Sequence, residues 1–209
     1  MSEPEFSNPA YRIETKRLLV RCYNPSDAPL LAESITENVE HLRPWMPWAH
    51  SEPEPIEEKV ARLKRFRGMF DLGQNFVYGI FNPENTRLLG GTGLHPRLGP
   101  EELEIGYWIH KDCVNQGLVT ESTAALVKVA FELIHIHRLE IHCDPANAAS
   151  SAIPRKLGFL HEGTLRAKTR FLEGWSDSMV WGLLETDYPD SPASKAEIKV
   201  FDADGQQVL

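Results

Sequence analysis

The chain has 209 residues, of which 42% are hydrophobic and 25% charged, as expected of one ordinary globular domain. Its formal net charge of −8 argues against nucleic-acid binding by general neutralisation of phosphates. The longest apolar stretch, 124–136, contains charged residues and is far shorter than the roughly 20 residues of a membrane span. The N-terminus does not read as a secretory leader, and the three cysteines have no metal-binding spacing. These features favour a cytoplasmic protein without a disulfide framework.

Hydrophobic periodicity predicts the helices and strands along the chain. It predicts a strand at 11–23, a helix from Ala28, a helix at 55–73 and an antiparallel meander at 76–81, 88–95 and 103–110. It then predicts a helix at 118–134, a strand at 138–143, a helix at 147–157, a strand from Phe159 and a strand at 178–184.

This order predicts an α+β fold, an α/β hybrid with a mixed, mostly antiparallel sheet of seven strands and about four helices. A single domain is predicted over residues 11–187. Residues 188–209 are rich in Pro, Ser and Asp and are interpreted as a C-terminal tail.

The junction between the strand at 103–110 and the helix at 118–134 is a candidate anion site. After the turn from Asn115 to Gly117, the first backbone amides of the helix have no partner within it. These amides and the positive end of the helix dipole attract phosphates, and Gly117 permits a close approach. An ordinary loop-to-helix turn with one glycine explains the same residues equally well.

The segment 141–159 is more specific. It reads IHCDPAN and continues as N-x-x-S-x-x-I-x-x-K-L-G-F, starting at Asn147 with Ser150 at the serine position. This pattern resembles the second acetyl-CoA-binding motif of the GNAT N-acetyltransferase superfamily, and the turn at 114–119 resembles its pyrophosphate loop. Three further segments that precede that loop are similar to segments of the RimJ/RimL-like branch: ETKRLLVR, HLRPWMPW and EIGYWI.

The resemblance implies that the strands at 103–110 and 138–143 splay apart and that the pantetheine arm of acetyl-CoA lies between them. Ser150 resembles the serine that protonates the departing thiolate, and Asn147 also suits a helix N-cap. The loop departs from the family pattern at Val114 and Val119, which replace a polar and a small residue. The residues implied in cofactor binding are Ile109, Val114, Asn115, Gln116, Gly117, Leu118, Val119, Thr120, Asn147 and Ser150.

An acceptor amine must lose a proton, so a base is expected to face the gap. Glu104 is the first candidate, because it shares a strand face with Gly106 and Trp108, and His142 is the second. A glutamate proposed as the base in the ribosomal-protein serine acetyltransferases is replaced here by Thr169.

Three aromatic residues are predicted to bind the acceptor: Trp45, Trp48 and Tyr107. For the two tryptophans, which flank Met46-Pro47, burial in the core is the competing interpretation.

The sequence is therefore interpreted as an N-acetyltransferase that moves an acetyl group from acetyl-CoA directly to a primary amine. The acceptor would be a protein N-terminus, for example of a ribosomal protein, or a small cationic amine, and a homodimer is a further expectation. No metal is predicted, since His135 and His137 have no third ligand nearby in sequence. An acyl-CoA sensor without turnover stays open as an alternative, and so does a nucleotide-binding module, although GKS/T and GxGxxG do not occur.

Charge is unevenly distributed along the chain. Residues 33–58, on the predicted acceptor side, contain seven acids and one base, whereas residues 155–170 contain five bases and one acid. This distribution predicts a basic side for the phosphates of CoA and an acidic side that attracts a cationic amine.

Overall fold

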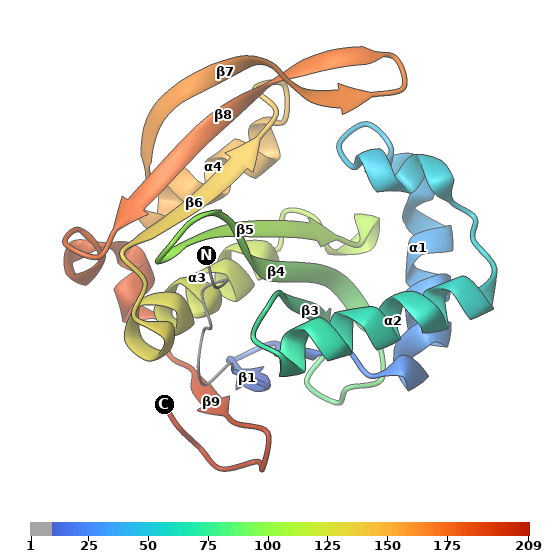
Figure 1. Ribbon diagram of the computed structural model, residues 1–209, viewed down its shortest axis with the longest axis horizontal. Coiled ribbons are helices and arrows are strands. Elements are labelled where there is room, and N and C mark those ends of the chain that lie inside the picture. The colour runs from blue at the N-terminus through green and yellow to red at the C-terminus, as the bar shows by residue number, and fades with distance from the viewer. Residues whose placement is uncertain (1–9) are drawn as a thin grey trace.

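One mixed sheet organises the protein (Figure 1). The computed structural model describes residues 10–209, and in this part of the chain nine strands lie in the order β7-β8-β6-β5-β4-β3-β2-β1-β9. All neighbouring strands are antiparallel except β5 and β6. The strands are β1 (Arg12–Glu14), β2 (Leu19–Cys22), β3 (Phe76–Phe81), β4 (Leu88–Gly99), β5 (Glu102–Ile109), β6 (Arg138–Cys143), β7 (Leu160–Phe171), β8 (Gly174–Leu184) and β9 (Lys199–Phe201).

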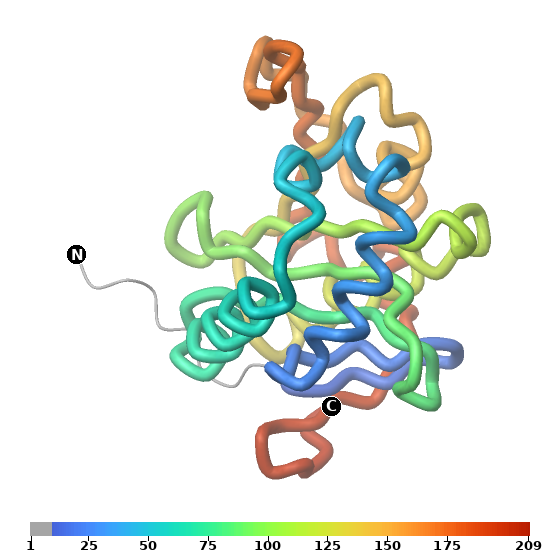
Figure 2. The backbone as a smooth tube through the Cα atoms, turned by 90° about the vertical axis from the view of Figure 1, so that its right-hand side faces the viewer, coloured from blue at the N-terminus to red at the C-terminus, as the bar shows by residue number. Residues whose placement is uncertain are grey.

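Helices cover both faces of the sheet (Figures 1 and 2). The helices are α1 (Ala28–Leu42), α2 (Ile56–Asp71), α3 (Leu118–Val129) and α4 (Ala148–Leu157). On one face, Leu31 and Ile35 of α1 pack with Leu63 of α2 against Phe81 and its neighbours. On the other face, the apolar side of α3 packs against strand residues that include Leu103. None of the described helices is long and apolar enough to cross a membrane.

The predicted α+β class is confirmed, but the described residues form two more strands than the seven predicted. The segment predicted as one strand at 11–23 is a hairpin, because Thr15 and Leu18 close a tight turn through backbone and side-chain hydrogen bonds of 3.0 Å. Residues 188–209, predicted as a tail, contain β9, which pairs with β1. Val200 of β9 is fully buried.

The parallel pair β5 and β6 separates part of the way along its length. Their register runs from Glu102 opposite Arg138 to Ile105 opposite Ile141 and stops there. Beyond that point, within residues 10–209, β5 continues to Ile109 paired with β4 alone, and β6 continues paired with β8 alone. The predicted splay of the central strands is therefore present, and no described strand pairs with the other edge of residues 106–109.

Candidate active site

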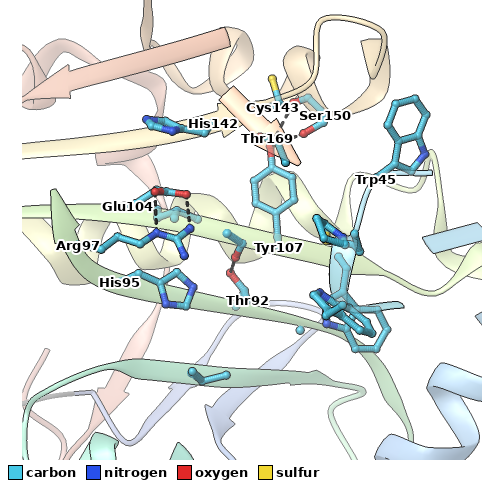
Figure 3. Close-up of a pocket in the computed structure, with 18 of the residues that line it drawn as sticks. Trp45, Thr92, His95, Arg97, Glu104, Tyr107, His142, Cys143, Ser150 and Thr169 are labelled. Atoms are coloured by element: carbon cyan, nitrogen blue, oxygen red, sulfur yellow. Dashed lines mark hydrogen bonds and ion pairs between the residues drawn. The ribbon is translucent and has the colours of Figure 1, made fainter. Parts of the chain in front are cut away.

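A pocket of about 990 Å³ lies where β5 and β6 part (Figure 3). Its walls come from β4 and β5, from the end of β6 and the start of α4, from the turn after α1, and from the distal part of the β7–β8 hairpin. That volume is within the range of small-molecule binding sites. The hairpin and the turn after α1 lie opposite each other (Figure 1), and residues of both line the pocket.

Ser150 and Tyr107 meet at the point where the strands diverge. The hydroxyl oxygens of the two side chains are 3.2 Å apart, and the Tyr107 hydroxyl also lies 3.1 Å from the Ser150 carbonyl oxygen. Burial raises the pKa of Tyr107, so its phenol stays protonated. Asn147 caps α4, accepting a hydrogen bond of 3.0 Å from the Ser150 amide, and this fixes the serine at the first turn of the helix. Two neutral hydroxyl groups are thus available to a leaving group.

Cys143 is a pocket residue that the sequence analysis did not single out. It is buried at the end of β6, and burial raises the pKa of its thiol, which keeps it protonated. Figure 3 shows it beside Ser150. In the sequence it alternates with Ile141 and Leu139 as a core position of a strand does, and no local signal distinguishes it from them.

Glu104 lies in the pocket, but its carboxylate is occupied. Arg97 of β4 binds both of its oxygens, with Nε 2.8 Å from Oε2 (Figure 3). Burial alone would raise the pKa of Glu104, but the hydrogen bonds and charge of Arg97 outweigh it, and the pKa lies below its usual value. A carboxylate held in this way is a poor proton acceptor.

His142 also lines the pocket and has a different environment. Its Nε2 lies 2.6 Å from Oε2 of Glu140, whose other oxygen accepts a hydrogen bond of 2.8 Å from Arg138. Among residues 10–209 no hydrogen bond involves Nδ1 of His142. The carboxylate of Glu140 therefore orients the imidazole and leaves one ring nitrogen available.

A second histidine, His95, lies flat on the sheet. A Cβ built on Gly93 would be 2.6 Å from the His95 ring, so only a glycine leaves room for it. The ring Nδ1 lies 2.7 Å from Oδ1 of Asn75. Burial, helped by the charge of Arg97 and opposed by Glu104, lowers the pKa of His95 to about 4, so the imidazole is neutral.

The tryptophans of the 41–50 segment form part of the pocket wall. Trp45 is half-buried and Trp48 is 38% exposed, so neither is a core residue. Trp48 packs edge-on against Trp108 of β5, with ring centroids 6.2 Å apart. Trp108 itself lies over Gly91, where an added Cβ would be 2.4 Å from the indole nitrogen. Both tryptophans line the pocket, and their contact with the acceptor stays a prediction.

The predicted anion loop lies outside the pocket lining, on the surface before α3. Gly117 is the N-cap of α3 and has the left-handed conformation that favours glycine, with φ of 76°. In the part of the chain that the structure describes, no side-chain hydrogen bond caps this helix end. Arg17 braces the loop, donating a hydrogen bond of 2.9 Å to the Gln116 carbonyl and pairing with Glu121 at 2.6 Å. The role of Arg17 was missed because about a hundred residues separate it from the loop.

The other predicted cofactor residues divide between surface and interior. Val114, Asn115 and Gln116 are exposed, Val119 and Thr120 are half-buried, and Leu118 is buried in the core. Ile109 is half-buried opposite Gly90 at the end of β5. Within residues 10–209, no three His, Cys, Asp or Glu side chains are grouped as metal ligands.

An unpaired strand edge beside a cleft suits an extended substrate that carries amide groups, and a pair of hydroxyls at its mouth suits an acyltransferase. The model of the family described as the Acetyltransferase (GNAT) domain matches residues 17–160, and the chain belongs to that family. It is an N-acetyltransferase that takes its acetyl group from acetyl-CoA and transfers it to an amine.

Known proteins similar to this chain include ribosomal-protein acetyltransferases. The ribosomal protein uS5-alanine N-acetyltransferase of Escherichia coli (strain K12) is 27% identical over 185 residues, covering 86% of this chain and 94% of the relative. The structure of RimL, a ribosomal L7/L12 alpha-N-protein acetyltransferase in complex with coenzyme A, has a TM-score of 0.75, 22% identity and coverage of 81% and 95%. The microcin C7 self-immunity acetyltransferase MccE, in complex with acetyl-CoA and AMP, has a TM-score of 0.75, 19% identity and coverage of 81% and 93%.

Proposed function

We propose that the acceptor is the α-amino group of a protein N-terminus, and a ribosomal protein in the first instance. The observation that carries this proposal is the match to the uS5-alanine enzyme along nearly all of that relative's length. The pocket supports it, since a cavity of about 990 Å³ with an aromatic wall accommodates several residues of a peptide. A cytoplasmic site of action belongs to the same proposal, and association as a homodimer stays a prediction.

The reaction we propose is direct transfer. The acceptor nitrogen attacks the thioester carbonyl carbon, the C–S bond breaks, and the amine proton passes to a base. The Ser150 hydroxyl donates its proton to the departing thiolate and recovers one through Tyr107, whose hydroxyl is 3.2 Å away. Holding both substrates in one cleft supplies a large share of the acceleration.

For the base we favour His142 over Glu104. The free Nδ1 of His142 can accept a proton, and Glu140 stabilises the resulting imidazolium. Glu104 instead holds Arg97 in place beside the acceptor. The catalytic role first predicted for Glu104 is tested with the same assay.

The proposal predicts that acetyl-CoA releases thiol in the presence of peptides with free ribosomal N-termini, and that acetylated N-termini do not react. Thiol release and peptide mass are the measurements. Ser150→Ala should lower kcat about 100-fold, the size of a lost proton donor, with little change in the Kd of acetyl-CoA. Ser151→Ala is the matched control, because the Ser151 hydroxyl donates its hydrogen bond to the Ala148 carbonyl of its own helix.

The base is tested by comparing His142→Gln with Glu104→Gln. A larger fall in kcat for Glu104→Gln would return the base role to Glu104. Binding of acetyl-CoA without thiol release from any amine, including polyamines and amino acids, would support the sensor, and binding of ATP alone would support the nucleotide module.

A further inference from the structure

The charges that line the pocket differ from those expected from the sequence. None of the acids in residues 33–58 lines it. Four of them pair with basic side chains: Glu52 with Lys59 at 2.7 Å, Glu54 with Arg62, Glu40 with Arg43, and Glu37 with His110. The five bases of residues 155–170 include Lys168 and Arg170, and both line this pocket rather than the loop before α3. The acidic segment 33–58 therefore contributes no carboxylate to the pocket lining.

Lys168 and Arg170 are the pocket cations that no acid neutralises. Arg97 is bound by Glu104, and Arg62 is bound by Glu54. For Lys168 and Arg170 no ion pair occurs within residues 10–209, and Arg170 only lies over the Trp175 ring, 5.5 Å from its centroid.

The nearby pocket acids are engaged in holding the backbone. Asp177 accepts a hydrogen bond of 2.9 Å from the Ala167 amide, and Asp144 accepts one of 2.7 Å from the Ala146 amide and another from the Ser176 hydroxyl. These contacts fix the two carboxylates and leave the side chains of Lys168 and Arg170 available to a ligand.

An irregularity in β7 directs these cations to the pocket. Along a regular strand only alternate residues face one side. Here the register with β8 shifts between Leu165 and Thr169, and Ala167 has a left-handed φ of 50°. As a result the four consecutive residues 168–171 all line the pocket, opposite the turn that carries Trp45. Such a bulge re-aims side chains near active sites.

We propose that Lys168 and Arg170 form a subsite for an acidic side chain of the acceptor, close behind its N-terminal amine. This inference rests on the proposed function and deepens it, because it names the chemical class of N-terminus: a peptide with Asp or Glu among its first residues. The two cations bind the carboxylate by charge-assisted hydrogen bonds, and the amine reaches the gap beside Tyr107 and Ser150.

The test compares isosteric peptides, one with Glu at its second and third positions and one with Gln there. We expect kcat/KM to favour the Glu peptide about tenfold, the size of two partly exposed charge contacts, and added salt to reduce the preference. Lys168→Ala combined with Arg170→Ala should abolish this preference by raising the KM for the Glu peptide. Arg166→Ala is the matched control, since Arg166 is an exposed cation of the same strand that does not line the pocket. Lys168→Glu combined with Arg170→Glu should favour a Lys peptide.

Calorimetry on the CoA-loaded enzyme separates this inference from the proposed function. Charge-dependent binding of the Glu peptide without acetylation of any peptide would refute the function and leave the subsite standing. Equal acetylation of the Glu and Gln peptides by the unaltered enzyme would overturn the subsite alone. A weaker Kd for acetyl-CoA in the double alanine variant, with peptide preference retained, would assign the two cations to the cofactor and also overturn the proposal.

Discussion

At the scale of single residues, His95 shows how the pocket controls ionisation. Its imidazole is held against the sheet near the charges of Arg97 and Glu104, with Asn75 at Nδ1. Protonating this ring would place a cation beside the Arg97 guanidinium in a largely dehydrated position. The folded protein therefore keeps His95 neutral at a pH where an exposed histidine is half charged.

This difference predicts a stability that depends on pH. As pH falls, the unfolded chain takes up a proton at the ordinary value of 6.5, whereas the folded chain does so only near 4. Between those values protonation favours unfolding. From about pH 7 to about pH 5 the free energy of unfolding should fall by about 2 kcal/mol more in the unaltered protein than in His95→Gln.

Urea unfolding at the two pH values is the measurement for His95. His41→Gln serves as the control for exchanging a histidine for glutamine, because His41 is exposed in the last turn of α1. Equal pH dependence of the unaltered protein and His95→Gln would show that the ring is protonated in the fold.

Residues of the site differ in how far the sequence could predict them. Asn147 and Ser150 were singled out through the resemblance of their segment to a known motif, and helix geometry preserves the three-residue spacing of N-cap and hydroxyl that this motif contains. Lys168 and Arg170 were noted as charges but assigned to CoA, since nothing local indicates the bulge that turns them to the pocket. The pairing of Arg97 with Glu104 was missed because it depends on the register of a hairpin.

At the scale of elements, β9 extends the sheet beyond the segment predicted as the domain. It has three residues and pairs with the three residues of β1, so neither strand is long enough for alternation to predict it reliably. The longer strands, such as β3 with bounds of 76–81, were predicted correctly because their turn residues and apolar runs agree. Val200 contributes the buried contact of β9.

We expect Val200→Ala to lower the free energy of unfolding by about 2 kcal/mol, because it removes two methylene-sized groups from a fully buried position. Val208→Ala is the matched control: Val208 is 43% exposed, and its amide bonds to the Val200 carbonyl at 2.8 Å, a contact that the substitution preserves. Urea unfolding followed by tryptophan fluorescence gives both values. Equal losses would mean that β9 adds no specific stability.

At the scale of the whole molecule, the sheet consists of two parts with a short junction. Strands β1 to β5 and β9 form one part, and β6 to β8 form the other. The two parts are joined by four pairs of opposed residues between β5 and β6, and α3 packs against one face of the sheet. A ligand lying between the diverging strands would add hydrogen bonds where this ladder stops.

Acetyl-CoA is therefore expected to slow hydrogen exchange at the backbone amides of residues 106–109 that do not bond to β4, and to raise Tm. ATP is the matched control, because it has a polyphosphate chain but no pantetheine arm to act as an added strand. Mass spectrometry of exchanged peptides is the measurement, with β9 as the internal reference. The same protection from ATP would contradict a pantetheine arm between the strands.

The two rings that lie over Gly91 and Gly93 have a consequence for redesign. Because Trp108 and His95 rest directly on glycine backbone, the depth of this part of the pocket is set by these rings and not by the path of β4. A smaller side chain in place of Trp108 would enlarge the cavity until the backbone at Gly91 lines it, while the strands keep their register. A larger residue at Gly91 would displace the ring towards Trp48 and narrow the opening. The range of acceptors that a scaffold of this kind accommodates can thus be altered by exchanging these aromatic side chains while the backbone of the strand beneath them stays the same.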